Sequence, residues 1–344
     1  MTGVLETTIV LDPLQALSRD IREAATMLSR QEVRFLVDYY YQTQEDRKRG
    51  SNQVRSVEET GEPHKVLDWL ASNTNILEKN IAKALAAYSD AHPVGRWAES
   101  IVGIGPIISA GLLANIDIQK SPTVGHIWRF AGLDPTQKWG GKKVADAAVS
   151  AYRKENPSKS RRDAPTEKDA RLLAMEMSGL NPDSVLQLAT SDQKGDKKPL
   201  TWDSLSKALA VRPFNAGLKT LCWKIGESFV KVSNNPNDIY GHLYVERKEQ
   251  EIARNEAGEF ASQAADKLAR QNIGKGTDAY KSYIEGKLPP AHIHSRAKRW
   301  AVKLFLAHWH HVAYDIEYGT PPPKPYILTQ EGHTHYVAPP HWNA

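Results

Sequence analysis

Apolar residues in the N-terminal part of the chain recur at steps of three and four, the spacing that gives an α-helix one apolar face. Three such stripes follow one another: Leu14, Leu17, Ile21, Ala25 and Leu28, then Val33, Leu36, Val37, Tyr40 and Tyr41, then Val66, Leu67, Leu70, Leu77, Ile81, Leu85 and Tyr88. Asp12 and Pro13 predict the cap and first turn of the first helix. Long amphipathic helices bury their stripes by antiparallel packing, so residues 1–92 are expected to form a helical hairpin or small bundle.

The rest of the chain also favours helices, with two polar interruptions. Residues 93–143 contain short helical segments separated by glycines, and residues 144–200 are expected to be a polar, partly mobile insertion. Helical spacing returns over residues 201–318, including one charged helix expected over 239–271. Residues 319–344 are rich in proline and histidine, which predicts an extended tail. Strand patterns are scarce, so the predicted fold class is all-α.

Composition narrows the class of protein. The 344 residues are 40% hydrophobic and 25% charged, as in an ordinary folded chain. No apolar run is long enough to span a bilayer, and the N-terminus lacks the pattern of a signal peptide, so no membrane partner is expected. Cys222 is the only cysteine, which excludes an intramolecular disulfide and fits a cytoplasmic location. The net charge of +5 and the isoelectric point near 9.0 indicate a nucleic-acid partner only if the cations are clustered.

The segment WAESIVGIGPIISAGLLANID has the most specific local pattern. Gly103, Ile104 and Gly105 separate two helical segments, and Pro106 opens the second helix at a position where the missing N–H is not needed. We expect Ile104 to be buried under a tight turn, and Gly105 to require a positive φ. Bare amides at a helix N-terminus favour an anion. The pattern is typical of a helix-hairpin-helix that holds a DNA phosphate, and the alternative is a purely structural turn.

Several motifs along the chain add to this one. GIGPIISAGLLANI is followed by FAGLDP and then GGKK, and a later region contains Arg212-Pro213-Phe214-Asn215, NNPNDIYGHLYVERK and AKRWAVKLFLAHWHHVAY. Together they resemble the C-terminal domain of the bridge-RNA-guided insertion-sequence transposases, over about residues 95–143 and 208–318. The resemblance implies a function in DNA transposition and recombination, DNA as the partner, and structured RNA as a further candidate partner. A nucleoid-associated location would follow.

The same resemblance implies catalytic parts that are not evident here. The family carries a ribonuclease-H-like N-terminal domain with metal-binding carboxylates and a serine nucleophile in the glycine- and lysine-rich loop. TTIVLD is similar to an opening strand that would place Asp12 as the first ligand, but helices are predicted after it. The loop, residues 137–142, is QKWGGK without a serine, and Ser121 is expected to be a helix cap. No catalytic residue is assigned, and magnesium is expected only for an active transposase.

Positive charge gathers on the final helix, expected over 293–318, and near the loop. Arg296, Arg299 and Lys303 share one side of that helix, which we expect to face DNA, while Trp300, Leu304, His308 and His311 share a second side expected to pack. The candidate nucleic-acid-binding residues are Gly103, Ile104, Gly105, Lys142, Lys143, Arg212, Asn215, Arg296, Arg299 and Lys303.

Two further features carry weaker signals. The C-terminal region is rich in histidine, but apart from Asp315 no carboxylate or cysteine is spaced to complete a metal site, so none is assigned. Three consecutive tyrosines, Tyr39, Tyr40 and Tyr41, cannot all be buried on one helix, which suggests an interface in a homo-oligomer.

Three hypotheses of different classes remain open. The first is a DNA-binding protein related to insertion-sequence transposases but lacking a recognisable nuclease domain. The second is an active transposase or nuclease with relocated catalytic residues. The third is a helical scaffold protein with no role on nucleic acid.

Overall fold

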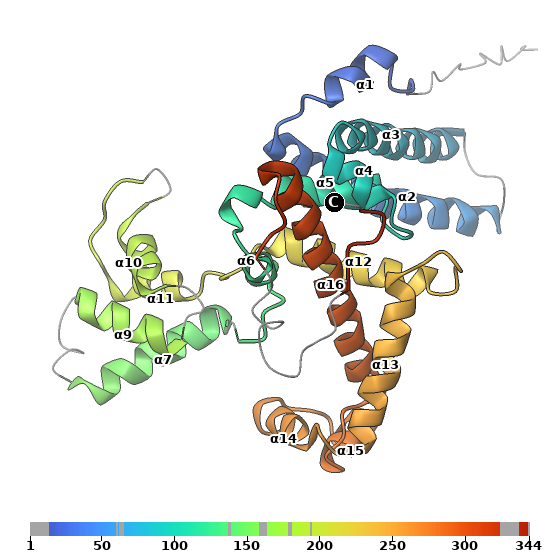
Figure 1. The fold of residues 1–344 in the computed structure, drawn as a ribbon. Coiled ribbons are helices and arrows are strands. Elements are labelled where there is room, and N and C mark those ends of the chain that lie inside the picture. The colour runs from blue at the N-terminus through green and yellow to red at the C-terminus, as the bar shows by residue number, and fades with distance from the viewer. Residues whose placement is uncertain are drawn as a thin grey trace, which may run out of the picture. The chain divides into compact units, whose positions relative to one another are not determined.

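The computed structural model describes residues 14–59, 61, 65–136, 139–157, 164–177, 181–192, 195–323 and 337–342 (Figure 1). Every named element within these residues is a helix, and the one β-bridge there pairs Ser191 with Lys197. The all-α prediction is therefore confirmed. None of the described helices is long and apolar enough to cross a membrane. Asp12 and Pro13, predicted to start the first helix, lie outside the described residues.

The chain divides into two compact units. One comprises the residues up to Pro122 together with those from Lys224 onward, and the other is Thr123–Trp223. The first contains α1 (Arg19–Ala25), α2 (Arg30–Glu58), α3 (Lys65–Asp90), α4 (Pro93–Glu99), α5 (Pro106–Asn115), the 3-10 turn η1 (Ile118–Lys120), α13 (Tyr240–Glu256), α14 (Ala261–Arg270), α15 (Asp278–Ile284) and α16 (Pro290–Tyr318). The second contains α6 (Val124–Phe130), α7 (Gly141–Glu155), α9 (Glu167–Met177), α10 (Pro182–Thr190) and α11 (Trp202–Leu209). Helix α12 (Ala216–Val232) has residues in both.

Helices α2 and α3 form the predicted N-terminal hairpin and lie side by side (Figure 1). A capping box starts α2, because the Ser29 side chain accepts from the Glu32 amide while the Glu32 carboxylate accepts from the Ser29 amide. Val33 and Val37 on α2 and Leu85 on α3 are buried, as their spacing predicts.

Helices α13 and α16 pack along each other in the same unit (Figure 1). The prediction of a single helix over 239–271 is wrong, because the chain forms two helices, α13 and α14, with a turn between them. Gly258 lies in that turn with a φ of 80°, a conformation that ends a right-handed helix. Helix α16 ends in the same way at Gly319, whose φ is 67°.

The second unit has its own apolar core despite its polar sequence. Helices α7, α9, α10 and α11 bury Ala145, Val149, Ala170, Leu173, Ala174, Val185, Ala189, Trp202, Leu205, Ala208 and Leu209. Small residues supply much of this core, so the segment 144–200 contains fewer large apolar residues than a helical region usually shows.

Residues 337–342 of the tail pack on α4 and α16 in the first unit. The Trp97 indole donates to the Pro340 carbonyl at 2.8 Å, and the Trp342 indole donates to Asp315 Oδ2 at 3.0 Å. His308 Nε2 lies 2.8 Å from the Val337 carbonyl.

Candidate nucleic-acid interface

The turn between α4 and α5 contains Gly103, Ile104 and Gly105. Ile104 is buried beneath it, with 4% of its surface exposed. Gly105 is the N-cap of α5, Pro106 is its first residue, and no side chain caps the helix. The first amides of α5 therefore lack a side-chain acceptor, which is the condition for holding an anion at a helix N-terminus.

The two glycines of the hairpin have different roles, and the prediction of a positive φ at Gly105 is wrong. Gly105 has a φ of −99°, and an added Cβ would meet nothing within 4 Å. Gly103 has a φ of 91°, and a Cβ there would lie 3.1 Å from a methyl group of Val232. The Gly103 carbonyl also accepts a hydrogen bond from the Ser228 hydroxyl at 2.5 Å. Gly103 therefore lets the turn pack closely against α12, whereas the space around Gly105 is open.

Three separate sequence motifs meet in the second unit. The Asn215 amide donates to the Phe130 carbonyl at 2.8 Å, which joins RPFN to FAGLDP. Gly132 has a φ of 64°, and a Cβ there would lie 2.9 Å from the Phe214 ring, so glycine allows this ring to pack. Phe214 in turn meets Trp139 of the loop edge to face, with ring centroids 6.0 Å apart. The resemblance identified these motifs, but their contact with one another is visible only in the structure.

Two cations cover the aromatic rings at this junction. The Arg212 guanidinium carbon lies 5.2 Å from the centroid of Trp139, and Lys219 Nζ lies 4.1 Å from the centroid of Phe214. Both distances are within the range of a cation–π interaction. Arg212 is a predicted site residue, whereas Trp139, Phe214 and Lys219 were missed as site residues. The sequence signal available was the aromatic residue inside each basic motif.

Asn215 has a structural role in this arrangement. Its Oδ1 accepts from the Leu218 amide at 2.9 Å, which satisfies a free donor in the first turn of α12. The Asn215 side chain therefore helps to start α12, and its contact with nucleic acid stays a prediction.

Lys142 and Lys143 lie in the first turn of α7. Lys142 pairs with Asp146 one turn later at 3.0 Å, while Lys143 is exposed and makes no ion pair within the described part of the chain. A hydrogen bond from Ser206, followed by the one from Lys142, lowers the pKa of the Asp146 carboxyl. Gly140 is the N-cap of α7 and offers no side-chain acceptor to its amides.

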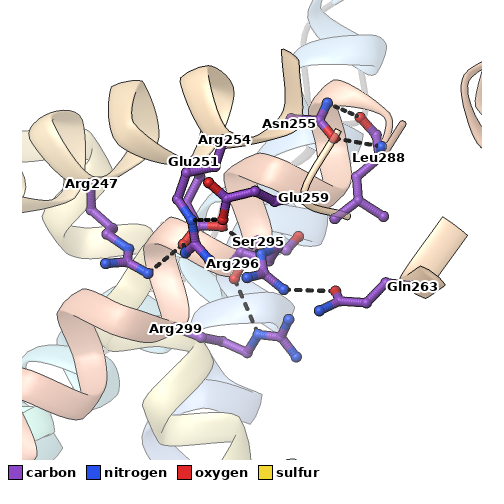
Figure 2. Close-up of polar contacts among 10 residues, drawn as sticks. All are labelled: Arg247, Glu251, Arg254, Asn255, Glu259, Gln263, Leu288, Ser295, Arg296 and Arg299. Carbon is purple, nitrogen blue, oxygen red and sulfur yellow. Dashed lines mark hydrogen bonds and ion pairs between the residues drawn. The ribbon is translucent and has the colours of Figure 1, made fainter. Parts of the chain in front are cut away.

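Arg296 belongs to an ion-pair network between α13, α14 and α16 (Figure 2). Its Nε donates to Glu251 at 2.6 Å and a terminal nitrogen donates to Gln263 at 2.9 Å. Its guanidinium carbon lies 4.3 Å from the Phe260 ring centroid. Only 21% of the side chain is exposed, so the bonding capacity of Arg296 is largely used inside the protein.

Glu251 is the centre of this network. Its side chain is 2% exposed and pairs with Arg247 and Arg254 as well as Arg296. Burial acts to raise the pKa of Glu251, but the hydrogen bond and charge of Arg296 and the charge of Arg247 outweigh burial, so the pKa is lowered. The Glu251–Arg296 pair joins α13 to α16, and the bond from Arg296 to Gln263 joins α16 to α14.

The basic side of α16 is exposed over only part of its length. Arg299 is exposed, and its Nε donates to the Ser295 carbonyl of its own helix at 3.3 Å (Figure 2). Lys303 is half-buried, and further along the same side His310 is buried, with Nε2 2.8 Å from the Ser121 carbonyl. Arg299 is therefore the most accessible of the three predicted cations.

The other side of α16 packs most closely near His308, which is 3% exposed. Trp300, Leu304 and His311 are half-buried, and the Arg247 guanidinium carbon lies 5.5 Å from the Trp300 ring centroid. Burial lowers the pKa of His308 to about 4, so the ring is neutral near pH 7.

Two side chains with nucleophile chemistry, Ser121 and Cys222, are buried. Ser121 is buried and is not the predicted cap, because Thr123 is the N-cap of α6. Cys222 is buried, and burial raises the pKa of its thiol to about 12. No group of three or more histidine, cysteine or acidic side chains in the described part of the chain could hold a metal ion.

Among the described residues the protein is all-helical, with a glycine-containing turn before α5 and a glycine- and lysine-rich start of α7. The model of the IS116/IS110/IS902 transposase family matches residues 96–155. This segment runs from α4 through α7, so it includes the hairpin and the loop around Trp139. No curated protein and no solved structure gives a significant match. The chain is thus similar to these transposases over a minor part of its length.

Proposed function

We propose that the protein binds DNA as a relative of insertion-sequence transposases and holds it mainly through backbone phosphates. The observation that carries this proposal is the family match over residues 96–155, which contains two helix starts, α5 and α7, that both have glycine N-caps without a side-chain acceptor. Free amides at such helix starts suit phosphate oxygens. We take the Gly103–Gly105 hairpin as one phosphate contact and the start of α7 as another.

Accessible cations support the same function. Lys143 and Arg212 lie in the second unit and Arg299 in the first, and none of the three makes an ion pair with a described residue. Cations without an internal carboxylate can release counterions from DNA when they bind phosphate. Lys142, which pairs with Asp146, and Lys303 lie near these positions in sequence and are further proposed phosphate contacts.

The test is fluorescence anisotropy of a labelled duplex of about 30 base pairs, titrated with the full chain between about 50 and 300 mM salt. The logarithm of affinity should fall linearly with the logarithm of salt, by about 0.9 for each phosphate contacted. Random and designed sequences should bind alike, because amides and lysines that contact phosphate do not distinguish bases. A preference of about a thousandfold for one sequence over random duplex would overturn phosphate-dominated binding.

A double variant with one change in each unit makes the test specific to the proposed contacts. Lys143→Ala combined with Arg299→Ala should flatten the salt slope by up to about two units. The matched control is Lys120→Ala with Lys281→Ala, which removes two exposed lysines that each pair with an aspartate three residues away. Equal effects of the two double variants would show that binding follows the net charge of the protein and not these two positions.

The family match also favours a second function, catalysis of strand transfer. Nicking and joining assays with magnesium test it, and product formation would show that catalytic residues lie at positions the resemblance does not assign.

The remaining candidate partners have their own tests. Binding of structured RNA is tested by competition against duplex DNA at fixed salt. Light scattering of the free chain tests the proposed homo-oligomer. Absence of binding to every nucleic acid would favour the scaffold hypothesis.

A further inference from the structure

Trp139 is an aromatic side chain held at the surface of the second unit by two contacts. The residue is 42% exposed. Its indole nitrogen donates to the Ala210 carbonyl at 2.9 Å, and its ring meets Phe214 at an interplanar angle of 80°. A large apolar ring left accessible costs hydrophobic free energy, and one held in place has also lost side-chain entropy before any ligand arrives. Such a ring can bind a flat ligand with little further ordering cost.

The glycines of the loop add to this placement. Gly141 has a φ of 68°, and a Cβ there would lie 3.5 Å from the six-membered part of the Trp139 indole. At Gly140 a Cβ would lie 2.5 Å from the Val144 side chain. The two glycines thus let the backbone run close to the ring on one side and to α7 on the other. The indole sits directly beside the start of that helix.

The charges around Trp139 select the chemistry of the ligand. Arg212 lies over the Trp139 ring and Lys219 over the Phe214 ring, and neither cation has a carboxylate partner in the described chain. Two aromatic rings at a steep angle could form a cage for a quaternary ammonium, but these rings already carry the cations of the protein itself. A ligand with a flat π face and a negative charge fits instead.

We propose that Trp139 stacks on an unpaired nucleobase and that Arg212 contacts the phosphate next to that base. Nucleotides combine the two properties the surface selects, a π face and an anion, and base stacking on aromatic side chains is the usual mode of single-strand recognition. The inference rests on the proposed function, because it names the part of the nucleic acid bound at the loop. The unpaired base can belong to DNA or to RNA, which share this chemistry.

The experiment compares three duplexes at one salt concentration, of which the second and third have equal length and charge. The first is fully paired, the second has one central unpaired adenine, and the third has an abasic unit in place of that adenine. The full-length chain should prefer the unpaired adenine over the abasic unit by about 5- to 150-fold, the value of one base–aromatic stack. When 2-aminopurine replaces the adenine, its fluorescence should be quenched on binding.

Variants assign the preference to the indole. Trp139→Ala should abolish the preference for adenine over the abasic unit, while Trp139→Phe should keep most of it because a smaller ring still stacks. The matched control is Trp223→Ala, which removes another exposed tryptophan, 57% exposed on α12, and should leave the preference unchanged. Because adenine preference and quenching are measured on the unmodified chain, a variant that fails to fold does not decide the outcome.

Each outcome separates the inference from the proposed function. Equal affinity for the unpaired adenine and the abasic unit, with tight binding of both, would overturn the stacking site and leave DNA binding intact. No binding to any of the three duplexes would overturn the proposed function itself. Repeating the comparison with the unpaired adenosine in an RNA strand identifies the source of the base, since the larger preference marks the strand that the loop binds.

Discussion

Two groups of cations in this protein differ in what lies opposite them. On α13 and α16, Arg247, Arg254 and Arg296 surround the buried carboxylate of Glu251. In the second unit, Arg212 and Lys219 lie over aromatic rings. The first group is balanced by an internal anion and serves packing. The second keeps its full charge, because a ring attracts a cation without neutralising it.

The difference shows why cationic sequence is a poor guide to a binding surface. Arg296 and Arg299 lie on the same helix, three residues apart, and have the same side chain. One is held by Glu251 and Gln263, while the other, among the residues that the structure describes, donates only to its own helix backbone. What separates them is the position of α14 and of Glu251 on α13, and neither is given by the local sequence.

The largest effect is expected from removing the anion of the first group. Glu251→Gln should lower the free energy of unfolding by about 3 to 5 kcal/mol, because three guanidinium groups would be left around an uncharged side chain that is out of contact with water. Denaturant unfolding measures this change. The matched control is Glu259→Gln, since Glu259 pairs with Arg254 but is 47% exposed, and it should cost about 1 kcal/mol or less. Equal costs would erase the distinction between the two groups of cations.

The contribution of the Glu251 carboxylate to stability should depend on pH in the acid range. The pKa of Glu251 in the folded protein lies below its ordinary value of 4.5. The charged form therefore stabilises the fold above the pKa of the unfolded chain, and this contribution is lost as pH falls through the lowered folded pKa. The stability gap between the unmodified chain and Glu251→Gln should be constant near neutral pH and shrink in the acid range. A gap that widens on acidification would contradict this sign.

A comparison of Arg296→Ala with Arg299→Ala sharpens the contrast on one helix. Arg296→Ala should lower the free energy of unfolding by about 2 to 4 kcal/mol, because Glu251 loses an ion-pair partner and the Phe260 ring loses its contact with the guanidinium. Arg299→Ala should change stability by less than about 0.5 kcal/mol and lower the salt slope of DNA binding by about one unit. Thermal melts and anisotropy measure the two quantities. A folded Arg296→Ala protein that loses only DNA binding would place both arginines on the nucleic-acid surface.

The hairpin glycines give a smaller contrast of the same kind. Gly103→Ala should cost about 1 to 2 kcal/mol, because alanine disfavours the φ of 91° found there. Gly105→Ala should change stability by no more than about 0.5 kcal/mol, since the position has an ordinary φ and open space around its Cα. If the proposed phosphate contact is correct, the methyl group that Gly105→Ala adds should nonetheless weaken DNA binding. Unchanged DNA affinity of this variant would make the hairpin a structural turn.

Sequence alone predicted the parts of the molecule that local rules control. Periodicity predicted the helical hairpin, and the Gly-Ile-Gly-Pro pattern predicted the buried Ile104 and the start of α5 at Pro106. It placed the positive φ on the wrong glycine, because which of the two adopts it depends on how the turn packs against α12. The meeting of Trp139 and Phe214 is a long-range contact between two loops, and no spacing rule along the chain determines such a contact.

The smallest effect on stability is expected where a cation lies over an accessible ring. Arg212→Ala should change the free energy of unfolding by less than about 1 kcal/mol, because an exposed cation–π contact contributes no more than that. It should still lower the salt slope by about 0.9, the value of one phosphate contact. Arg171→Ala is the matched control in the same unit, since Arg171 is 46% exposed but already paired with Asp183, and its removal should leave the slope unchanged. The opposite result would be a large loss of stability with an unchanged salt slope of DNA binding. The cations over the rings would then serve packing, as Arg296 does, and would not contact DNA.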